Sequence, residues 1–467
     1  MVLSRIWSGF IIVAILVASA KYLFSDHYKQ IYNDMVVGKS GDTIQIASQP
    51  MTEFSPTIQK NLHLKPEFKD NRIQYKTDSA QSQVAVYRVQ QTDGVIGTSE
   101  TAVKICLGLI GIMTLFMGFM SIAEKAGGIN LLSRMIQPFF SKLFPEIPKN
   151  HPSFGHMVLN FSANLLGLDN AATPFGLKAM ESLQTLNPDK DKASNSQIMF
   201  LCLHAGGLTL IPVSIIAIRA SMGSHTPTDI FLPCMIATFA ATLAAMIVVS
   251  LYQKINLLQP AVIGYVGGIS AIIALLVVYL VSLSKEGLDD FSMLLSNGII
   301  LLIFFAIILG AVYKKINVFD AFVEGAKEGF WTCVKIIPYL VGMLIAISLL
   351  RTSGVFDVLI DGMKWVAQVA GFDTRFVDGL PTALIKPLSG SGARGMMVDT
   401  MQTFGADSFQ GRLAAVLQGS SDTTFYVIAV YFGAVGIKNT RYTVTAMLLA
   451  DLVGVITSVI LAYIFFA

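Results

Sequence analysis

Long apolar windows recur along this sequence and constrain its fold more strongly than any other feature. A helix of about 20 predominantly apolar residues is long enough to cross a bilayer. Such helices also satisfy their own backbone hydrogen bonds in the absence of water. The sequence therefore predicts an all-α polytopic membrane protein of about nine spans. Eight windows cover residues 6–24, 103–122, 197–220, 230–251, 261–283, 293–312, 336–350 with its flanks and 444–467, and a ninth, 413–435, is interrupted by polar residues at 418–422.

The overall composition agrees with a membrane location. Hydrophobic residues make up 54% of the chain and charged residues 13%, and the mean hydropathy is +0.63. The net charge of +3 is too small to indicate a nucleic-acid partner. Cys106, Cys202, Cys234 and Cys333 all lie in apolar windows and lack Cys-x-x-Cys spacing. We predict that they are free, buried thiols rather than disulfides or metal ligands.

The N-terminal apolar window has two interpretations. Arg5, the apolar run and the small residues at 18–20 satisfy the pattern of a cleavable secretory signal. We favour an uncleaved first transmembrane helix over residues 1–24, because a similar lone helix at 293–312 precedes the second half of the chain.

The next segment, residues 25–98, differs in kind because it is polar. Apolar and polar side chains alternate in stretches such as 43–46 and 84–89, which is typical of short β-strands. The sequence therefore predicts a small β-rich extracytoplasmic insert between the first two spans. A partly ordered loop is the competing interpretation.

The rest of the chain repeats one order of elements. A span is followed by an amphipathic stretch, a broken hairpin, an interrupted span with a polar centre and a final span. We expect a first repeat over 99–258, a linker transmembrane helix over 259–290 and a second repeat over 291–467. Each copy is expected to have an even number of full spans. One extra transmembrane helix between the copies would therefore give the second copy the opposite orientation in the membrane.

The distribution of basic residues predicts the topology, because short cytoplasmic loops carry an excess of Lys and Arg. A cytoplasmic N-terminus places most basic loops inside and the long insert outside. We therefore expect a multi-pass protein of a bacterial inner (plasma) membrane. The basic residues placed inside are Lys125, Arg134, Lys142, Lys149, Lys190, Lys192, Lys254, Lys314, Lys315, Lys438 and Arg441.

A polar segment interrupts the apolar pattern in each half, at 164–174 and at 387–395. Broken backbone at membrane depth is tolerated only where protein buries it or where it lines a wet cavity. Corresponding breaks in two halves therefore indicate a binding site of the kind found in inverted-repeat transporters.

The first break offers hydrogen-bonding groups beside the start of a half-helix. Pro174 suits the first turn of that helix, and its free N–H groups could hold an anion or a polar group. The competing interpretation is that the polar side chains merely cap the break. The predicted substrate-binding residues here are Asn164, Asp169, Asn170 and Thr173.

The second break combines Ser389 and Ser391 with glycines that allow close backbone approach. Arg394 then brings a permanent charge to membrane depth, where charges are costly and usually functional or paired. We expect it to bind substrate and to pair with Asp169 or Asp422. The competing interpretation is that Arg394 lies near the interface and extends to water.

Asp422 is the strongest candidate for an ion- or proton-coupling carboxylate, because it lies in the middle of an apolar window. Its polar neighbours Gln418, Ser420, Ser421 and Thr423 are expected to contact substrate, although small polar residues also pack helices together. His204, at the matching level of the first half, is a second coupling candidate that could equally be a hydrogen-bonded structural residue. For Asp451 in the last span, both interpretations are equally open.

The first break and its continuation, 164–180, resemble the spore maturation protein A family. The second break together with 418–426 resembles the spore maturation protein B family. The chain is thus similar to a fusion of the two. The resemblance implies a nucleoside-recognition, or Gate, domain group whose relatives include concentrative nucleoside transporters and the membrane part of ferrous iron transport protein B. It implies two Gate-type repeats with re-entrant helical hairpins.

We expect a transporter-like protein that binds or moves a small polar solute, nucleoside-like or other, by alternating access coupled to an ion or proton. The alternative is a non-transporting membrane component of envelope, cell-wall or spore maturation. It would act through a protein partner docked on residues 25–98, or as a homo-oligomer. The chain has no H-E-x-x-H helix, P-loop or G-x-S-x-G elbow, so we expect neither an enzyme nor a bound cofactor or metal.

Overall fold

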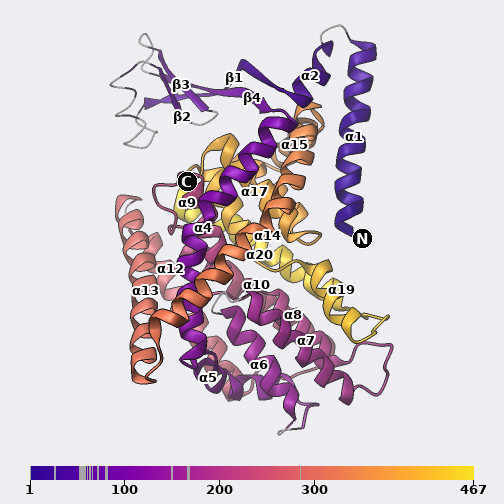
Figure 1. Ribbon diagram of the computed structural model, residues 1–467, viewed down its shortest axis with the longest axis vertical. Helices are drawn as coiled ribbons and strands as arrows, with labels where there is room; N and C mark the ends of the chain where they lie inside the picture. Colours follow the sequence, from indigo (N-terminus) through magenta and orange to yellow (C-terminus); the bar gives the residue numbers. More distant parts are fainter. Residues whose placement is uncertain are drawn as a thin grey trace.

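The chain folds into a bundle of membrane-length and half-length helices with a small β-sheet at one end (Figure 1). The computed structural model describes residues 2–25, 28–51, 59, 62, 65, 67–70, 73–78, 83–148, 151–165, 169–283 and 285–467. Within this part of the chain, seven helices are long and apolar enough to cross a membrane. They confirm the prediction of a polytopic helical membrane protein, although they number seven where the sequence predicted about nine spans.

The helices up to residue 253 are α1 (Val2–Phe24), α2 (Ile31–Val36), α4 (Val95–Lys125), α5 (Gly128–Leu143), α6 (Pro152–Leu165), α7 (Asp169–Leu186), α8 (Asn195–Ala205), α9 (Val213–Ser221) and α10 (Phe231–Gln253). The helices after it are α11 (Pro260–Val262), η3 (Ile263–Gly267), α12 (Gly268–Val281), α13 (Lys285–Tyr313), α14 (Val318–Thr352), α15 (Val355–Val369), η4 (Arg375–Gly379), α16 (Leu380–Ile385), α17 (Gly390–Phe404), α18 (Phe409–Gly419), α19 (Thr424–Ala434) and α20 (Thr443–Phe466).

The sheet lies between α2 and α4 in the sequence. Its strands β1 (Gly38–Pro50), β2 (Glu67–Asp70), β3 (Ile73–Asp78) and β4 (Gln83–Asp93) are antiparallel neighbours in the order β1-β4-β3-β2. The long β1–β4 ribbon pairs Gly38 with Asp93, next to the start of α4. Figure 1 places the sheet at one end of the bundle and α5 at the opposite end.

The helices from α4 to α10 correspond in order and kind to those from α14 to α20. Each series begins with a long helix followed by an amphipathic helix, and glycines with positive φ, Gly127 and Gly354, stand at both junctions. Each series then contains two half-helices, and the next helix is capped by a serine, Ser194 or Ser408. The two halves therefore place glycine and serine at the same helix boundaries in the same order.

The two leading helices, α4 and α14, pack against each other along much of their length. Gly325 and Gly329, four residues apart on α14, lie against the backbone of α4, where a Cβ on Gly325 would be 2.3 Å from the Met117 carbonyl oxygen. A small-xxx-small spacing of this kind lets membrane helices approach closely. The trailing helices α10 and α20 also pack together, so equivalent elements of the two halves meet in the core.

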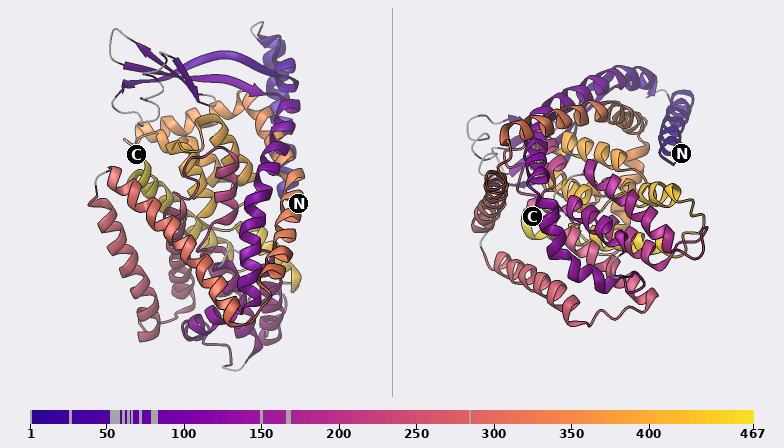
Figure 2. Two further views of the ribbon diagram at one scale, coloured as in Figure 1. Left: turned by 60° about the vertical axis from the view of Figure 1, so that its left-hand side comes forward. Right: turned by 60° about the horizontal axis from the view of Figure 1, so that its bottom comes forward.

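The remaining long helices surround this core. α1 lies along α14, where Trp7 Nε1 donates to the Gly342 carbonyl at 2.8 Å and Lys21 Nζ donates to the Ser353 carbonyl at 2.7 Å. α12 and α13 lie at the periphery of the bundle (Figure 2), and most of the apolar window of each is unburied. Apolar surface of this extent is expected to face lipid.

Loops of the two halves meet at two places. In one, the α9–α10 loop contacts the α17–α18 loop through a cluster formed by Arg219, Ser224, Asp229, Asp407 and Arg412, which we call the Arg219 cluster. In the other, the α7–α8 loop pairs with the α19–α20 loop through backbone bonds from Ala193 N to the Asn439 carbonyl and from Lys438 N to the Asp191 carbonyl. The α9–α10 and α7–α8 loops of the first half thus contact the second-half counterparts of one another, which makes the two contacts reciprocal.

The structure corrects one sequence prediction and confirms another. The apolar windows 197–220 and 413–435 each form two shorter helices, α8 with α9 and α18 with α19, because the backbone breaks at 206–212 and 420–423. The four cysteines are free and buried, as predicted.

Candidate functional site

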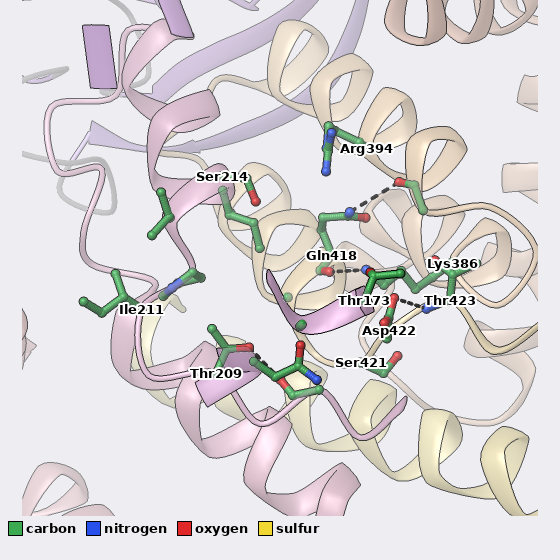
Figure 3. A pocket seen from close by; sticks show the side chains of 18 of the residues that line it. Thr173, Thr209, Ile211, Ser214, Lys386, Arg394, Gln418, Ser421, Asp422 and Thr423 are labelled. Carbon is green, nitrogen blue, oxygen red and sulfur yellow. Dashed lines mark hydrogen bonds between the residues drawn. The ribbon is translucent and has the colours of Figure 1, made fainter. Parts of the chain in front are cut away.

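A cavity of about 390 Å³ lies where both broken hairpins and both interrupted spans converge. It is lined by α4, α6, α7, α8 and α9 of the first half and by α14, α17, α18 and α19 of the second. Figure 3 shows the polar side chains that point into it. Eight of the predicted site residues line this cavity: Asn164, Thr173, His204, Arg394, Gln418, Ser421, Asp422 and Thr423.

The first hairpin places Asn164 near the end of α6 and Thr173 in the first turns of α7. Both side chains are partly buried and reach the cavity. The predicted roles of Asp169 and Asn170, and the pairing of Asp169 with Arg394, lie outside the side chains that the structure describes.

The second hairpin breaks between α16 and α17. Ser389 is the N-cap of α17, and its Oγ accepts the Gly392 N–H at 2.9 Å, so this predicted binding residue caps the helix. Ser391 lies 3.3 Å from it, Oγ to Oγ, and lines a smaller adjacent cavity of about 50 Å³ with Arg394. A Cβ at Gly390 would lie 2.7 Å from Thr423 Oγ1, so glycine lets this helix start approach the α18–α19 break closely.

His204 links the first hairpin to the break in the second half. Its ring is buried, with 5% of the side chain exposed, and its Nδ1 lies 2.8 Å from Asn164 Nδ2 and 3.1 Å from Asn160 Oδ1. Its Nε2 lies 3.6 Å from Asp422 Oδ2. The two predicted coupling residues are therefore neighbours across the two halves.

Asp422 lies in the break between α18 and α19, and its side chain is 43% exposed. Its carboxylate accepts the Thr423 N–H at 2.6 Å, and its own N–H donates to the Ala205 carbonyl at 2.8 Å. Gly207, which follows closely on Ala205, has a φ of +65°, a conformation that favours glycine. The backbone of one broken span thus directly supports the other.

Each broken span is also bonded to the hairpin of its own half. The Leu210 N–H donates to the Leu165 carbonyl at 2.8 Å, and the Phe425 N–H donates to the Pro387 carbonyl at 2.9 Å. These bonds satisfy backbone groups that would otherwise be unpaired in a nonpolar environment. In each half, one backbone hydrogen bond thus joins the hairpin to the broken span beside the cavity.

Lys386 is a site residue that the sequence reasoning missed. It lies one residue before Pro387, is 8% exposed, and its Nζ donates to the Gln418 carbonyl at 2.7 Å. A lone lysine in the apolar stretch next to the second break was the available signal. The side chain of Gln418 donates from Nε2 to the Gly390 carbonyl at 3.4 Å. Its buried Oε1 has no hydrogen-bond partner among the described residues.

Two other polar residues of this region are buried and hydrogen-bonded, Ser420 within its own turn and Asp451 between α19 and α20. The Ser420 hydroxyl donates to the Leu417 carbonyl at 3.0 Å, and the side chain is buried away from the cavity lining. Asp451 accepts a bond of 2.5 Å from Thr424 Oγ1. Both arrangements agree with the structural interpretation of these residues.

Arg394 and Asp422 face the same cavity from different levels. Figure 3 shows Gln418 between them, and the partner at salt-bridge distance from Asp422 is His204. The expected role of Arg394 at the cavity therefore does not depend on direct pairing with Asp422. Across the described ranges, no group of three or more His, Cys, Asp or Glu residues could hold a metal ion.

The helices and the central cavity define a polytopic helical membrane protein built from two related halves. The Gate family model, described as nucleoside recognition, matches the chain in two segments, 106–224 and 333–438. The chain is 47% identical over 172 residues to spore maturation protein B of Bacillus subtilis (strain 168), covering 37% of this chain and 95% of that protein. It is 43% identical over 156 residues to spore maturation protein A of the same organism, covering 33% of this chain and 80% of that protein.

With this coverage of both relatives, the chain belongs to the family of spore maturation proteins A and B. The resemblance noted in the sequence is thereby confirmed. No solved structure matches the chain.

Proposed function

We propose that this protein binds a small polar solute in the central cavity and moves it across the membrane by alternating access. The observation that carries the proposal is the convergence of four broken elements, two from each half, on one cavity of about 390 Å³. Discontinuous helices around a site between two repeats are a recurring design of secondary transporters. The match to a nucleoside-recognition family supports nucleosides as one substrate class to test.

The proposal includes an inverted relation between the two halves. It is supported by the positions of the amphipathic helices, because α5 and α15 lie toward opposite ends of the bundle (Figure 1). The reciprocal contacts between the loops also support it, since the α9–α10 loop meets the α17–α18 loop while the α7–α8 loop meets the α19–α20 loop. Two such halves could expose one site to either side by rocking against each other.

Asp422 and His204 are proposed to couple transport to protons or another cation. The distance of 3.6 Å between His204 Nε2 and Asp422 Oδ2 supports this, because a proton or cation at Asp422 would change the interaction between the halves. The partial exposure of Asp422 to the cavity gives an ion access to the carboxylate. No enzymatic step and no cofactor is part of the proposal.

For topology, we propose a bacterial inner membrane with the N-terminus in the cytoplasm and the sheet outside. The predicted inside loops are rich in Lys and Arg. The sheet and α5, which follows Lys125, lie at opposite ends of the bundle (Figure 1), which supports this assignment.

The experiment is solute uptake and ligand-dependent thermal stabilisation of the purified full chain in a panel of nucleosides, amino acids, organic acids, peptidoglycan fragments and cations. A ligand that binds the native state raises its stability in proportion to ln(1 + [L]/Kd). We expect a compound that stabilises the wild type and is transported, with both effects lost in Asp422→Asn. Asp189→Asn, in the exposed α7–α8 loop, is the matched control and should behave as wild type.

A second candidate function is favoured by the names of the two relatives, both of which are spore maturation proteins. In this proposal the chain is a membrane component of envelope, cell-wall or spore maturation that acts through a partner docked on the sheet. A docking protein would lose activity when residues 25–98 are deleted and would tolerate changes of Asp422 and Arg394. A transporter would show the reverse.

A further inference from the structure

We propose that the buried ammonium group of Lys386 is a built-in cation for the break between α18 and α19. It takes a position, next to the Gln418 carbonyl and attracted by the Asp451 carboxylate, that would otherwise suit a metal cation such as Na⁺. The inference rests on the proposed function for one consequence, which is that solute binding and uptake by the native protein require no Na⁺.

Lys386 holds its charge at the end of a half-helix. The residue is 8% exposed, and its Nζ donates to the Gln418 carbonyl at 2.7 Å (Figure 3). Gln418 belongs to the last turn of α18, where helix carbonyls have no partner within the helix and carry partial negative charge. In transporters with broken helices, such carbonyl ends coordinate Na⁺. Lys386 therefore places an ammonium group where those proteins hold an ion.

Asp451 supplies the negative charge for this position from the last helix, α20. The residue is 6% exposed, and its carboxylate accepts a bond of 2.5 Å from Thr424 Oγ1. The Ser421 hydroxyl also bonds to this carboxylate, and Lys386 attracts it electrostatically. Carboxylate, hydroxyl and carbonyl oxygens are the ligands that hard cations prefer. The same oxygens would therefore suit Na⁺ if the ammonium group were removed.

The first half of the chain has neither charge at the equivalent positions. In each half, one residue comes directly before the hairpin carbonyl that bonds to the broken span: Lys386 before Pro387, and Asn164 before Leu165. The counterpart of α20 is α10, whose sequence contains no Asp, Glu, Lys or Arg. The lysine and the carboxylate thus occur together in the second half and are replaced together in the first. This is expected of two charges that are each costly alone at membrane depth.

Asp422 is a separate carboxylate in the same break. It accepts the Thr423 N–H at 2.6 Å and lies 3.6 Å from His204 Nε2. Both of these neighbours are nitrogen atoms, whereas Na⁺ is held by oxygen atoms. The coupling role proposed for Asp422 is therefore compatible with a protein that needs no Na⁺.

The test measures the melting temperature of the full chain in detergent at constant ionic strength, with NaCl exchanged for choline chloride. The variants are Lys386→Ala, alone and combined with Asp451→Asn, and the control is Lys438→Ala, which removes an exposed pair with Asp191. We expect the wild type and the control to melt at the same temperature in both salts. Lys386→Ala should be less stable in choline chloride and should regain stability with NaCl in proportion to ln(1 + [Na⁺]/Kd). Adding Asp451→Asn should abolish that response.

The opposite results would overturn the inference. If Na⁺ does not stabilise Lys386→Ala more than choline does, the lysine is only a structural partner of Asp451. If Na⁺ stabilises the wild type and Asp451→Asn removes that effect, Na⁺ already binds at this position beside the lysine. Should Lys386→Ala fail to fold in either salt, Lys386→Met is compared with its combination with Asp451→Asn. The neutral combination should be the more stable of the two, because the lone carboxylate is removed; no gain in stability would show that the two charges are not partners.

Uptake measurements separate this inference from the proposed function. Solute uptake by the wild type that is equal in choline and sodium media would support the built-in cation. Uptake that strictly requires Na⁺ would overturn the inference and leave transport standing. A sodium response of Lys386→Ala without uptake of any solute would support the built-in cation and contradict the transport function.

Discussion

Replacing Arg219 with methionine should destabilise the protein more than any surface substitution, because this side chain is fully buried between the two halves. Its Nη2 lies 2.8 Å from Asp229 Oδ1 and 3.0 Å from Asp407 Oδ1, and its Nη1 donates to the Ala406 carbonyl at 2.7 Å. Methionine fills much of the same volume but leaves both carboxylates without this partner.

The magnitude follows from what remains in the Arg219 cluster. Removing one partner of a buried ion pair typically costs about 3–5 kcal/mol, because the other charge stays buried and uncompensated. Arg412 still pairs with Asp229, and Ser224 still donates to Asp407. We therefore expect the lower part of that range, about 3–4 kcal/mol. The control Lys438→Met removes an exposed pair with Asp191 and should cost at most about 1 kcal/mol.

The assay is equilibrium unfolding in detergent, with helix content followed by circular dichroism across a denaturant series. The single variant Asp407→Asn and the double variant Arg219→Met with Asp407→Asn complete a double-mutant cycle that measures the coupling, and residues in one ionic network usually couple by about 0.5–3 kcal/mol. If Arg219→Met were no more destabilising than Lys438→Met, the cluster would not hold the loops of the two halves together.

Two further predictions concern the same architecture. Gly325→Leu should destabilise the protein by about 1–3 kcal/mol or more through overpacking, because the new Cβ would strike the Met117 carbonyl. The control is Gly310→Leu on α13, where a side chain has open space. Comparable melting temperatures for the two variants would contradict the close α4–α14 contact. For Asp407, in the α17–α18 loop, burial alone would raise the pKa, but the hydrogen bonds from Ser224 and His225 and the nearby arginines lower its pKa below the ordinary 3.8. The stabilising contribution of the ionised Asp407 carboxylate is therefore complete above pH 3.8, the ordinary pKa, and is lost as pH falls through the lower folded-state pKa. The stability of the wild type should fall more steeply below pH 3.8 than that of Asp407→Asn, and parallel acid unfolding curves would refute this.

Much of the membrane architecture could be predicted from the sequence, because the transfer of a helix into lipid depends on the local run of apolar residues. The broken segments at 164–174 and 387–395 were visible for the same reason, since polar residues stand out against an apolar background. The motifs also carried the family resemblance, which the comparisons confirm. Their roles in binding and coupling stay predictions.

The assignment of individual side chains required the tertiary structure. Ser389 and Ser391 look alike in the sequence, yet Ser389 caps α17 while Ser391 lies against Arg394 in the adjacent cavity. Ser420 and Ser421 are neighbours, and the second of them lines the central cavity. The side of the helix on which a residue lies decides such differences. A short, interrupted helix has no regular periodicity from which that side could be predicted.

The amino-acid sequence by itself determined that this chain forms membrane-spanning helices with a polar break in each half, because those properties depend on a few neighbouring residues. Only the tertiary structure decided that Lys386 reaches the cavity, that His204 meets Asp422, and that Arg219 joins two loops. These contacts connect residues about 190 to 220 positions apart in two of the three cases. Their formation depends on how α4 and α14 and the trailing helices pack, which no local window of sequence contains.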